Sequence, residues 1–319
     1  MLASGTSYFE ALFINLQVVW YRADGIVFIP PIAKKKINRS VRRYSQVGSS
    51  SGRNPMANKL IKYGVEDGVA ILTIDDPPAN TYTYEMMQDL DDAILQARFD
   101  EKVHVIVLRG GGEKFFSAGA NINMLQTSDP YFKYFFCLHA NETLTRLEQT
   151  PKLVIGALNG HTVGGGLEIA LACDIRIARK DAGKIGLPEV NLGVLPGTGG
   201  TQRLGRILGK SKSIELMVEG RTFGFSEALE LGLINKILEG DNAEFFNQVM
   251  EYAKQFTPPH KASRAVGRIK RSVCSGTEVP FSEGLAIERE LQQLLFQGED
   301  AKEGLAAYIE KRTPAFTGR

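Results

Sequence analysis

Short runs of β-branched and aliphatic residues alternate with helical stretches, and this alternation is the feature that most constrains the fold. The runs are bounded by glycine, proline or charged residues, which predicts short buried strands. The predicted strands are Val69–Ile74, Val103–Leu108, Leu153–Leu158 and Ile175–Ala178, with helices predicted at Glu85–Phe99 and Tyr131–Leu147. Such alternation is typical of an α/β protein whose helices cover a sheet.

Strand signals nearly vanish after Lys210. The remaining chain has the periodicity of successive helices. These are predicted at Ser211–Glu219, Ser226–Leu231, Ala243–Phe256, Lys261–Val273, Phe281–Phe296 and Asp300–Arg312. The sequence therefore predicts a core domain over residues 56–210 and a helical lobe over 211–319.

Residues 1–55 differ in charge from the rest of the chain. They carry eight basic and two acidic residues, a net charge of +6, whereas residues 56–319 carry 30 basic and 34 acidic residues, a net charge of −4. Residues 34–53 have the basic, serine-rich composition of a mitochondrial transit peptide, but the first 33 contain a single basic residue. We favour the alternative that this leader is a non-native extension, upstream of a start at Met56 or left by a fusion. In either case we expect residues 1–55 to be disordered.

Overall composition excludes several classes of protein. The whole chain has 319 residues and a net charge of +2, so it is not a polybasic nucleic-acid binder. Its three cysteines, with no CxxC or Cys/His cluster, predict neither a disulfide framework nor a zinc site. The longest uncharged run near the N-terminus, Ala11 to Tyr21, is far shorter than the ~20 apolar residues of a membrane-spanning helix. We therefore expect no metal and no membrane partner.

A glycine-rich segment follows the predicted strand Leu153–Leu158. The letters NGHTVGGG lead into an apolar helix, LEIALACD. Consecutive glycines at a helix start leave backbone N–H groups bare, at the positive end of the helix dipole, where they suit an anion or a developing oxyanion. Glu168 lies in this helix among apolar residues, which indicates a paired or functional acid; a partly exposed first-turn acid remains the alternative.

A second acid has similar surroundings. Glu189 lies 21 residues after Glu168 and is also flanked by apolar residues. Two carboxylates in one apolar pocket repel, which raises the proton affinity of one of them. One can then act as a base while the other acts as an acid. A third element, KFFSAGANIN at residues 114–123, again has small residues that leave backbone N–H groups accessible.

At these three elements the sequence resembles the crotonase (enoyl-CoA hydratase/isomerase) superfamily. The matching stretches are FFSAGANINML, NGHTVGGGLEIALACDIRIA and GLPEVNLGVLPGTGGTQRLGRILGKS, followed by RTFGFSEALELGLINKI and AKEGLAAYIEKR. The likeness covers residues 56–319 and none of 1–55. It implies an α/β spiral of ββα units with a C-terminal helical lobe used for trimerisation, as a homotrimer or a hexamer built as a dimer of trimers. It also implies an acyl-CoA thioester substrate, with no cofactor beyond the coenzyme A that belongs to the substrate.

The resemblance also implies roles for particular residues. The backbone N–H groups of Ala120 and Gly165 would form the oxyanion hole, with Ala118 and Gly164 beside the substrate. Glu168 would orient and deprotonate a water, and Glu189 would protonate C2. This combination of two acids is that of an enoyl-CoA hydratase, a hydro-lyase that adds water to a trans-2-enoyl-CoA in fatty acid β-oxidation or related acyl-CoA breakdown.

Two other functions stay open from the sequence. Isomerases and thioester hydrolases of the superfamily use the same oxyanion hole without one or both acids. An RNA-binding relative is disfavoured, but it would use a basic stripe of Lys261, Arg264, Arg268 and Arg271 on one predicted helix.

The sequence departs from the family pattern at two sites. The usual Gly-Ala-Asp-Ile-Lys reads Gly119-Ala120-Asn121-Ile122-Asn123, which removes a lysine that helps to hold CoA phosphates. Lys311 is a weak replacement candidate, and a solvated charge at a helix end is the alternative. Residues 76–83, DPPANTYT, differ from the commoner Ala-Leu-Asn ending, so we expect a different acyl preference. The expected compartment is the bacterial cytoplasm if Met56 is the start, and the mitochondrial matrix if the leader is a transit peptide.

Overall fold

The computed structural model describes residues 11–14, 17–22, 25–26 and 59–319. The chain divides between Ala57 and Asn58 into two units. In the first, β1 (Ala11–Ile14), β2 (Gln17–Arg22) and β3 (Gly25–Ile26) pair as antiparallel neighbours. These strands differ from the disorder expected of residues 1–55, and the rest of that prediction lies outside the described residues.

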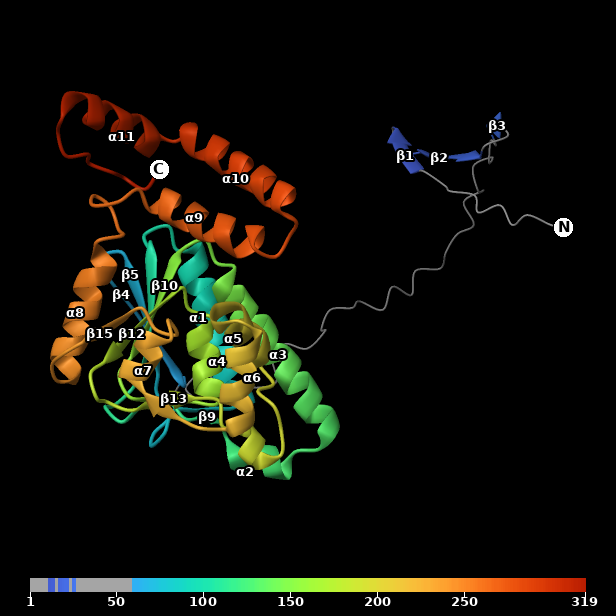
Figure 1. The fold of residues 1–319 in the computed structure, drawn as a ribbon. Helices are drawn as coiled ribbons and strands as arrows, with labels where there is room; N and C mark the ends of the chain where they lie inside the picture. The colour runs from blue at the N-terminus through green and yellow to red at the C-terminus, as the bar shows by residue number, and fades with distance from the viewer. Residues whose placement is uncertain (1–10, 15–16, 23–24, 27–58) are drawn as a thin grey trace. The chain divides into compact units, whose positions relative to one another are not determined.

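The second unit is built on a six-stranded sheet, which lies between α8 and α1 in Figure 1. The strands in spatial order are β15 (Lys236–Leu238), β12 (Ile175–Arg179), β10 (Leu153–Leu158), β7 (Val105–Gly110), β5 (Val69–Ile74) and β4 (Ile61–Glu66). All neighbours are parallel except β4, which pairs antiparallel with β5 at one edge. Five parallel strands need crossovers, and the helices between them supply these.

A smaller sheet repeats the same order beside the first. It runs β14 (Phe223–Gly224), β13 (Lys184–Gly186), β11 (His161–Val163) and β8 (Phe115–Ser117). Successive strands such as β7 and β8, or β10 and β11, therefore belong to different sheets, whereas β4 and β5 share the large sheet and β13 and β14 share the small one. After β11 comes α4 (Gly165–Leu171), and after β13 a short 3₁₀ helix, η1 (Glu189–Leu192). This confirms the α/β class and the spiral of ββα units.

Helices cover both faces of the large sheet, because side chains along each buried strand alternate between two cores. In β7, Ile106 and Leu108 face the larger core, and Val105 and Val107 face the smaller one. The larger core includes α1 (Tyr84–Phe99), α3 (Pro130–Glu148) and α4, and the smaller one includes α8 (Asn242–Lys254). Figure 1 shows α8 on one side of the sheet and α1 and α3 on the other.

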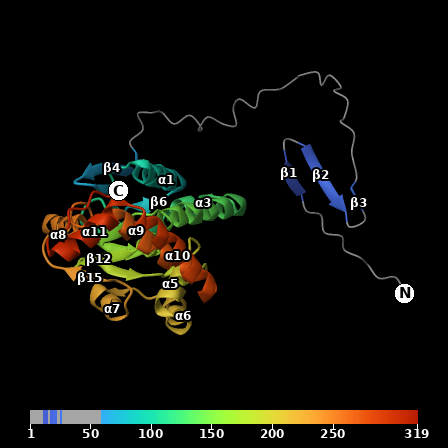
Figure 2. The same cartoon turned by 90° about the horizontal axis from the view of Figure 1, so that it is seen from above.

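The predicted boundary at residue 210 does not coincide with a break in the fold. After residue 210, β14 joins the smaller sheet and β15 joins the larger one. The helices α8 and α7 (Phe225–Glu230) also pack on the core. The elements that extend beyond this body are α9 (Ser263–Gly276), α10 (Phe281–Phe296) and α11 (Glu299–Glu310), which form a layer above it in Figure 1 and lie nearest the viewer in Figure 2. Within the described part of the chain, no helix is both long and apolar enough to cross a membrane.

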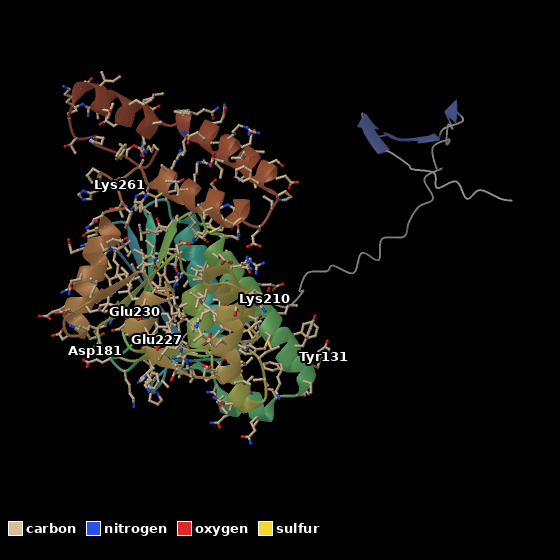
Figure 3. All side chains as sticks on the ribbon, in the orientation of Figure 1. Tyr131, Asp181, Lys210, Glu227, Glu230 and Lys261 are labelled. Atoms are coloured by element: carbon tan, nitrogen blue, oxygen red, sulfur yellow. The ribbon has the colours of Figure 1, made fainter. Side chains whose placement is uncertain are left out.

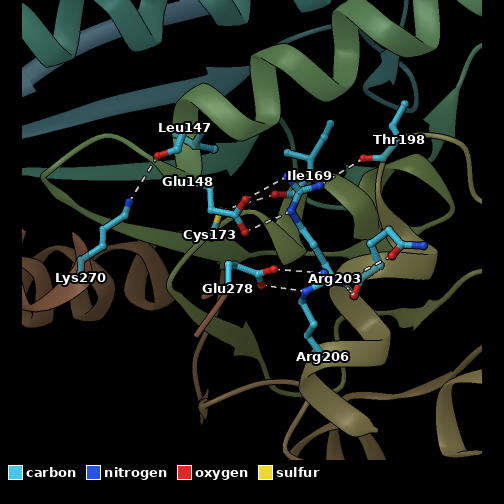
Figure 4. Close-up of polar contacts among 10 residues, drawn as sticks. Leu147, Glu148, Ile169, Cys173, Thr198, Arg203, Arg206, Lys270 and Glu278 are labelled. Carbon is cyan, nitrogen blue, oxygen red and sulfur yellow. Dashed lines mark hydrogen bonds and ion pairs between the residues drawn. The ribbon is translucent and has the colours of Figure 1, made fainter. Parts of the chain in front are cut away.

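A buried ion pair fixes α9 to the body. The Lys270 ammonium lies 2.9 Å from Asp174 and its side chain is 3% exposed. It also donates to the carbonyl oxygens of Leu147 and Lys152, and the first of these bonds is drawn in Figure 4. These acceptors offset the cost of burying the charge.

Candidate active site

The glycine-rich turn before α4 presents bare backbone. Gly164 precedes the helix at φ +56° and makes no side-chain cap, so the first N–H groups of α4 have no capping side chain. A Cβ added to Gly165 would lie 1.9 Å from Cε1 of Tyr82. Glycine is therefore required there, since the Tyr82 ring rests directly on the backbone of the helix start.

The strand β9 (Gly119–Ala120) lies against the same turn. It pairs with β6 (Thr81–Tyr82), and the N–H of Asn121 donates to the Tyr82 carbonyl oxygen at 3.1 Å. Because successive N–H groups of a strand point in opposite directions, the N–H of Ala120 points away from β6. A Cβ on Gly119 would lie 2.7 Å from the Gly165 nitrogen, so β9 and the start of α4 are in close contact. The backbones of Ala120 and Gly165 are therefore neighbours.

Glu168 lies in the first turn of α4 and is 1% exposed. Its Oε1 accepts hydrogen bonds from the backbone N–H groups of Thr198 at 2.8 Å and Gly200 at 2.7 Å, and its Oε2 accepts one from the Thr198 hydroxyl. Burial raises the pKa of this carboxyl, and these hydrogen bonds together with the charge of Arg203 oppose the rise. The alternative of an exposed first-turn acid is therefore wrong.

Glu189 begins η1 on the other side of the turn. A Cβ on Gly164 would lie 3.2 Å from its Oε1, so the carboxyl reaches the N-terminus of α4. Its Oε2 is buried and has no hydrogen-bond partner in the described structure. Burial raises the pKa of Glu189 to about 7; its own backbone N–H opposes the rise and the charge of Glu168 adds to it. This group is thus able to gain or lose a proton near neutral pH.

The loop that holds Glu168 is itself held by α3 and α5 (Gly200–Leu208). Arg203 donates through Nε and Nη2 to the two carboxylate oxygens of Glu148, at 3.2 and 3.1 Å. Its Nη1 donates to the Thr198 carbonyl oxygen, as Figure 4 shows. Asn141 of α3 donates to the Gly197 carbonyl oxygen at 3.1 Å. The loop donors are therefore fixed before any substrate arrives, which is what preorganisation requires.

Two side chains of the site were not identified from the sequence. Thr198 lies within the PGTGG stretch, where no pattern distinguishes it from its neighbours. Tyr82 belongs to the 76–83 segment, which the sequence marks only as a departure from the family pattern. That departure was the one available signal, because Tyr82 and Thr198 are 116 residues apart and meet only in the fold.

The other predicted residues are placed as follows. The N–H of Ala118 donates to the Ala79 carbonyl oxygen at 3.0 Å, beside β9. Asn121, where the family has aspartate, caps α2 (Ile122–Thr127) by accepting from the Met124 N–H. Lys311 ends α11 in the left-handed conformation and is exposed. Its role in binding CoA stays a prediction.

The described residues contain no group of three or more His, Cys, Asp or Glu side chains that could hold a metal ion. The groups described above at this site are two carboxyl groups and backbone N–H donors.

Comparison with known proteins gives a consistent result. Residues 64–319 match the family model described as enoyl-CoA hydratase/isomerase. A probable enoyl-CoA hydratase of Bacillus subtilis is 38% identical over 81% of this chain and 98% of its own. A short-chain-enoyl-CoA hydratase of Clostridium acetobutylicum is 38% identical over 77% and 93% of the two chains. The crystal structure of an enoyl-CoA hydratase from Geobacillus kaustophilus HTA426 aligns with a TM-score of 0.79 at 45% identity, covering 82% of this chain and 98% of that one.

Proposed function

Because this chain belongs to the enoyl-CoA hydratase/isomerase family, we propose that it is an enoyl-CoA hydratase, a hydro-lyase that reversibly adds water to a trans-2-enoyl-CoA to give a 3-hydroxyacyl-CoA. One observation carries the proposal. The buried carboxyl of Glu168 in the first turn of α4 and the half-buried carboxyl of Glu189, which reaches Gly164, lie at the N-terminus of one helix, beside the backbone of Ala120 and Gly165.

The proposed reaction begins at the thioester carbonyl. The N–H groups of Ala120 and Gly165 donate to its oxygen and stabilise the negative charge that develops there. The water oxygen bonds to C3, and the electron pair of the C2–C3 double bond moves towards C1. The thioester oxygen takes up the negative charge, which forms an enolate. The enolate then takes a proton at C2, which restores the thioester carbonyl.

The two acids supply the proton transfers. Glu168 takes a proton from the attacking water, and Glu189 gives a proton to C2. The Glu189 pKa of about 7 supports this assignment, since the group is then a competent acid near neutrality. After one turnover Glu168 is protonated and Glu189 is ionised, so a proton must pass from the first to the second, directly or through water, before the next cycle.

The proposal is tested by the loss of the conjugated enoyl-thioester ultraviolet absorbance when the protein meets crotonyl-CoA. We expect Glu168→Gln and Glu189→Gln each to lower kcat by about 10²–10⁴, the range for loss of general acid or base catalysis, with folding retained. Glu230→Gln is the matched control, since Glu230 is exposed at the end of α7, which supplies none of the site residues; it is labelled in Figure 3. Full activity in either active-site variant would refute the assignment.

Three alternatives are separated by simple measurements. A hydrolase of the same fold would release free CoA, which a thiol-trapping reagent detects, and an isomerase would yield a positional isomer of unchanged mass. An RNA-binding role would use the basic stripe, of which Lys261 lies just before α9 (Figure 3). It predicts binding that falls steeply with salt. Two paired acids in one site favour hydration over all three.

Further parts of the proposal concern assembly and setting. We propose a homotrimer or a hexamer of two trimers formed through the helical lobe, with Lys311 a candidate for the CoA phosphates of a neighbouring subunit and no cofactor other than substrate CoA. The proposed setting is fatty acid β-oxidation or related acyl-CoA breakdown in a bacterial cytoplasm, or in the mitochondrial matrix if the leader is a transit peptide. Sedimentation analysis of the full chain tests the assembly.

A further inference from the structure

Two buried hydroxyl groups connect Tyr82 to Glu168 through Thr198. We propose that Tyr82 and Thr198 are positioning residues, which hold Glu168 in one orientation and keep it hydrogen-bonded both before and after it takes a proton. This inference rests on the proposed function, in which Glu168 is the base that activates water.

The three hydrogen-bonded side chains are all shielded from solvent. Tyr82 is 4% exposed and Thr198 is 0% exposed. The Tyr82 hydroxyl lies 3.3 Å from Thr198 Oγ1, and Thr198 Oγ1 donates to Glu168 Oε2. The Thr198 N–H donates to the other carboxylate oxygen at 2.8 Å, so Thr198 is hydrogen-bonded to both oxygens of Glu168.

The direction of the hydrogen bonds depends on the protonation state of Glu168. An ionised carboxylate only accepts, so the Thr198 hydroxyl must donate to it and accept from the Tyr82 hydroxyl. If Glu168 gains its proton on Oε2, the acid donates to Thr198, and the Thr198 hydroxyl turns to donate to Tyr82. Hydroxyl groups do both, so each of the three side chains keeps a hydrogen-bond partner in either state. The three side chains can therefore accommodate the proton transfer without a backbone movement.

Other charged and titratable groups face Glu168 from the elements packed around it. Arg203 of α5 lowers its pKa, while Glu189 of η1 and Cys137 of α3 lie close enough for their charges to act on Glu168 or on Tyr82. Burial, and then the charge of Glu168, raises the pKa of Tyr82. The phenol therefore stays protonated at neutral pH and can donate to Thr198 when Glu168 is ionised.

The Tyr82 ring is fixed by its packing, so its hydroxyl is fixed as well. It lies on Gly165, the residue whose N–H is proposed to hold the thioester oxygen, and its centroid is 5.5 Å from that of Phe136. One ring thus contacts the backbone of the oxyanion hole and, through Thr198, the base. Tyr82 therefore fixes the position of Glu168 relative to the backbone of the oxyanion hole.

The test removes one hydroxyl at a time. Thr198→Val keeps the shape and the backbone N–H bond but deletes Oγ1, so the ionised form of Glu168 loses a donor. We expect kcat to fall by about tenfold to a hundredfold, the factor for one hydrogen bond to a charged group, with KM little changed. The acidic limb of the pH profile of kcat/KM should move to higher pH, and Thr198→Ser should restore both. Tyr82→Phe should cause a smaller fall in kcat and none in a Thr198→Val background.

Thr143→Val is the matched control, because Thr143 is also fully buried but its Oγ1 has no hydrogen-bond partner among residues 59–319. It should leave kcat and the pH profile unchanged. A second readout needs no turnover: infrared titration of the protonated Glu168 carboxyl band, assigned by its loss in Glu168→Gln. The band should persist to higher pH in Thr198→Val than in the native protein.

The outcomes separate this inference from the proposed function. If the native protein does not hydrate crotonyl-CoA but the infrared titration shifts as expected, the link to Glu168 holds and the proposed reaction is wrong. If Thr198→Val titrates like the native protein, or Thr198→Ser does not rescue it, the positioning role is refuted whatever the reaction.

Discussion

The substitution Gly119→Ala tests the proposed oxyanion hole most directly. Gly119 has φ +85°, and a Cβ there would lie 2.7 Å from the Gly165 nitrogen and 3.0 Å from the Val163 carbonyl oxygen. Ordinary contacts begin at 3.4 Å, so the Gly165 N–H must move by about 0.7 Å away from residue 119, which displaces it from the neighbouring Ala120 N–H. We expect kcat with crotonyl-CoA to fall by about 10²–10³, the loss found when one oxyanion donor is removed.

The matched control for this change is Gly232→Ala. Gly232 has a similar φ, +75°, but a Cβ there meets nothing within 4 Å. Both variants pay the backbone strain of a left-handed alanine, about 1–2 kcal/mol in the free energy of unfolding, which urea titration measures. Only Gly119→Ala should lose activity. If it keeps the native kcat while losing at least as much stability as Gly232→Ala, the placement of the oxyanion hole is wrong.

Three further predictions concern the acids and the core. With Glu189 acting as an acid of pKa about 7, hydration should slow as pH rises through 7, and Glu189→Gln should remove that limb of the kcat profile. Because a raised pKa disfavours the ionised form in the fold, Glu189→Gln should be at least as stable as the native protein at pH 8, measured by thermal unfolding. Lys270→Met should lower the free energy of unfolding by about 3–5 kcal/mol by leaving the largely buried Asp174 without its cationic partner, and adding Asp174→Asn should recover part of it.

The sequence located the long elements well. The predicted strands Val69–Ile74 and Leu153–Leu158 and the predicted helix Phe281–Phe296 coincide with β5, β10 and α10. Each is long enough to show a period of two, an unbroken apolar run or a helical period. The second sheet was not predicted as such, because its strands have two or three residues and no period to detect.

Part of the candidate site could also be predicted from the sequence. Glu168 and Glu189 could be singled out because each acid interrupts an apolar run, and the glycine turn before α4 could be identified because its backbone is bare. Their assignment as catalytic groups stays a prediction until the variants are measured.

The sequence alone determined the α/β class, the family and the two acids, since all of these are recorded in local patterns and motifs. Only the tertiary structure decided how each acid is held. Thr198 reaches Glu168 across 30 residues of chain and Tyr82 reaches Thr198 across 116, while one oxygen of Glu189 has no hydrogen-bond partner among residues 59–319. Such pairings depend on how β6, α4 and the loop before α5 pack together, and no local pattern in a single sequence specifies them.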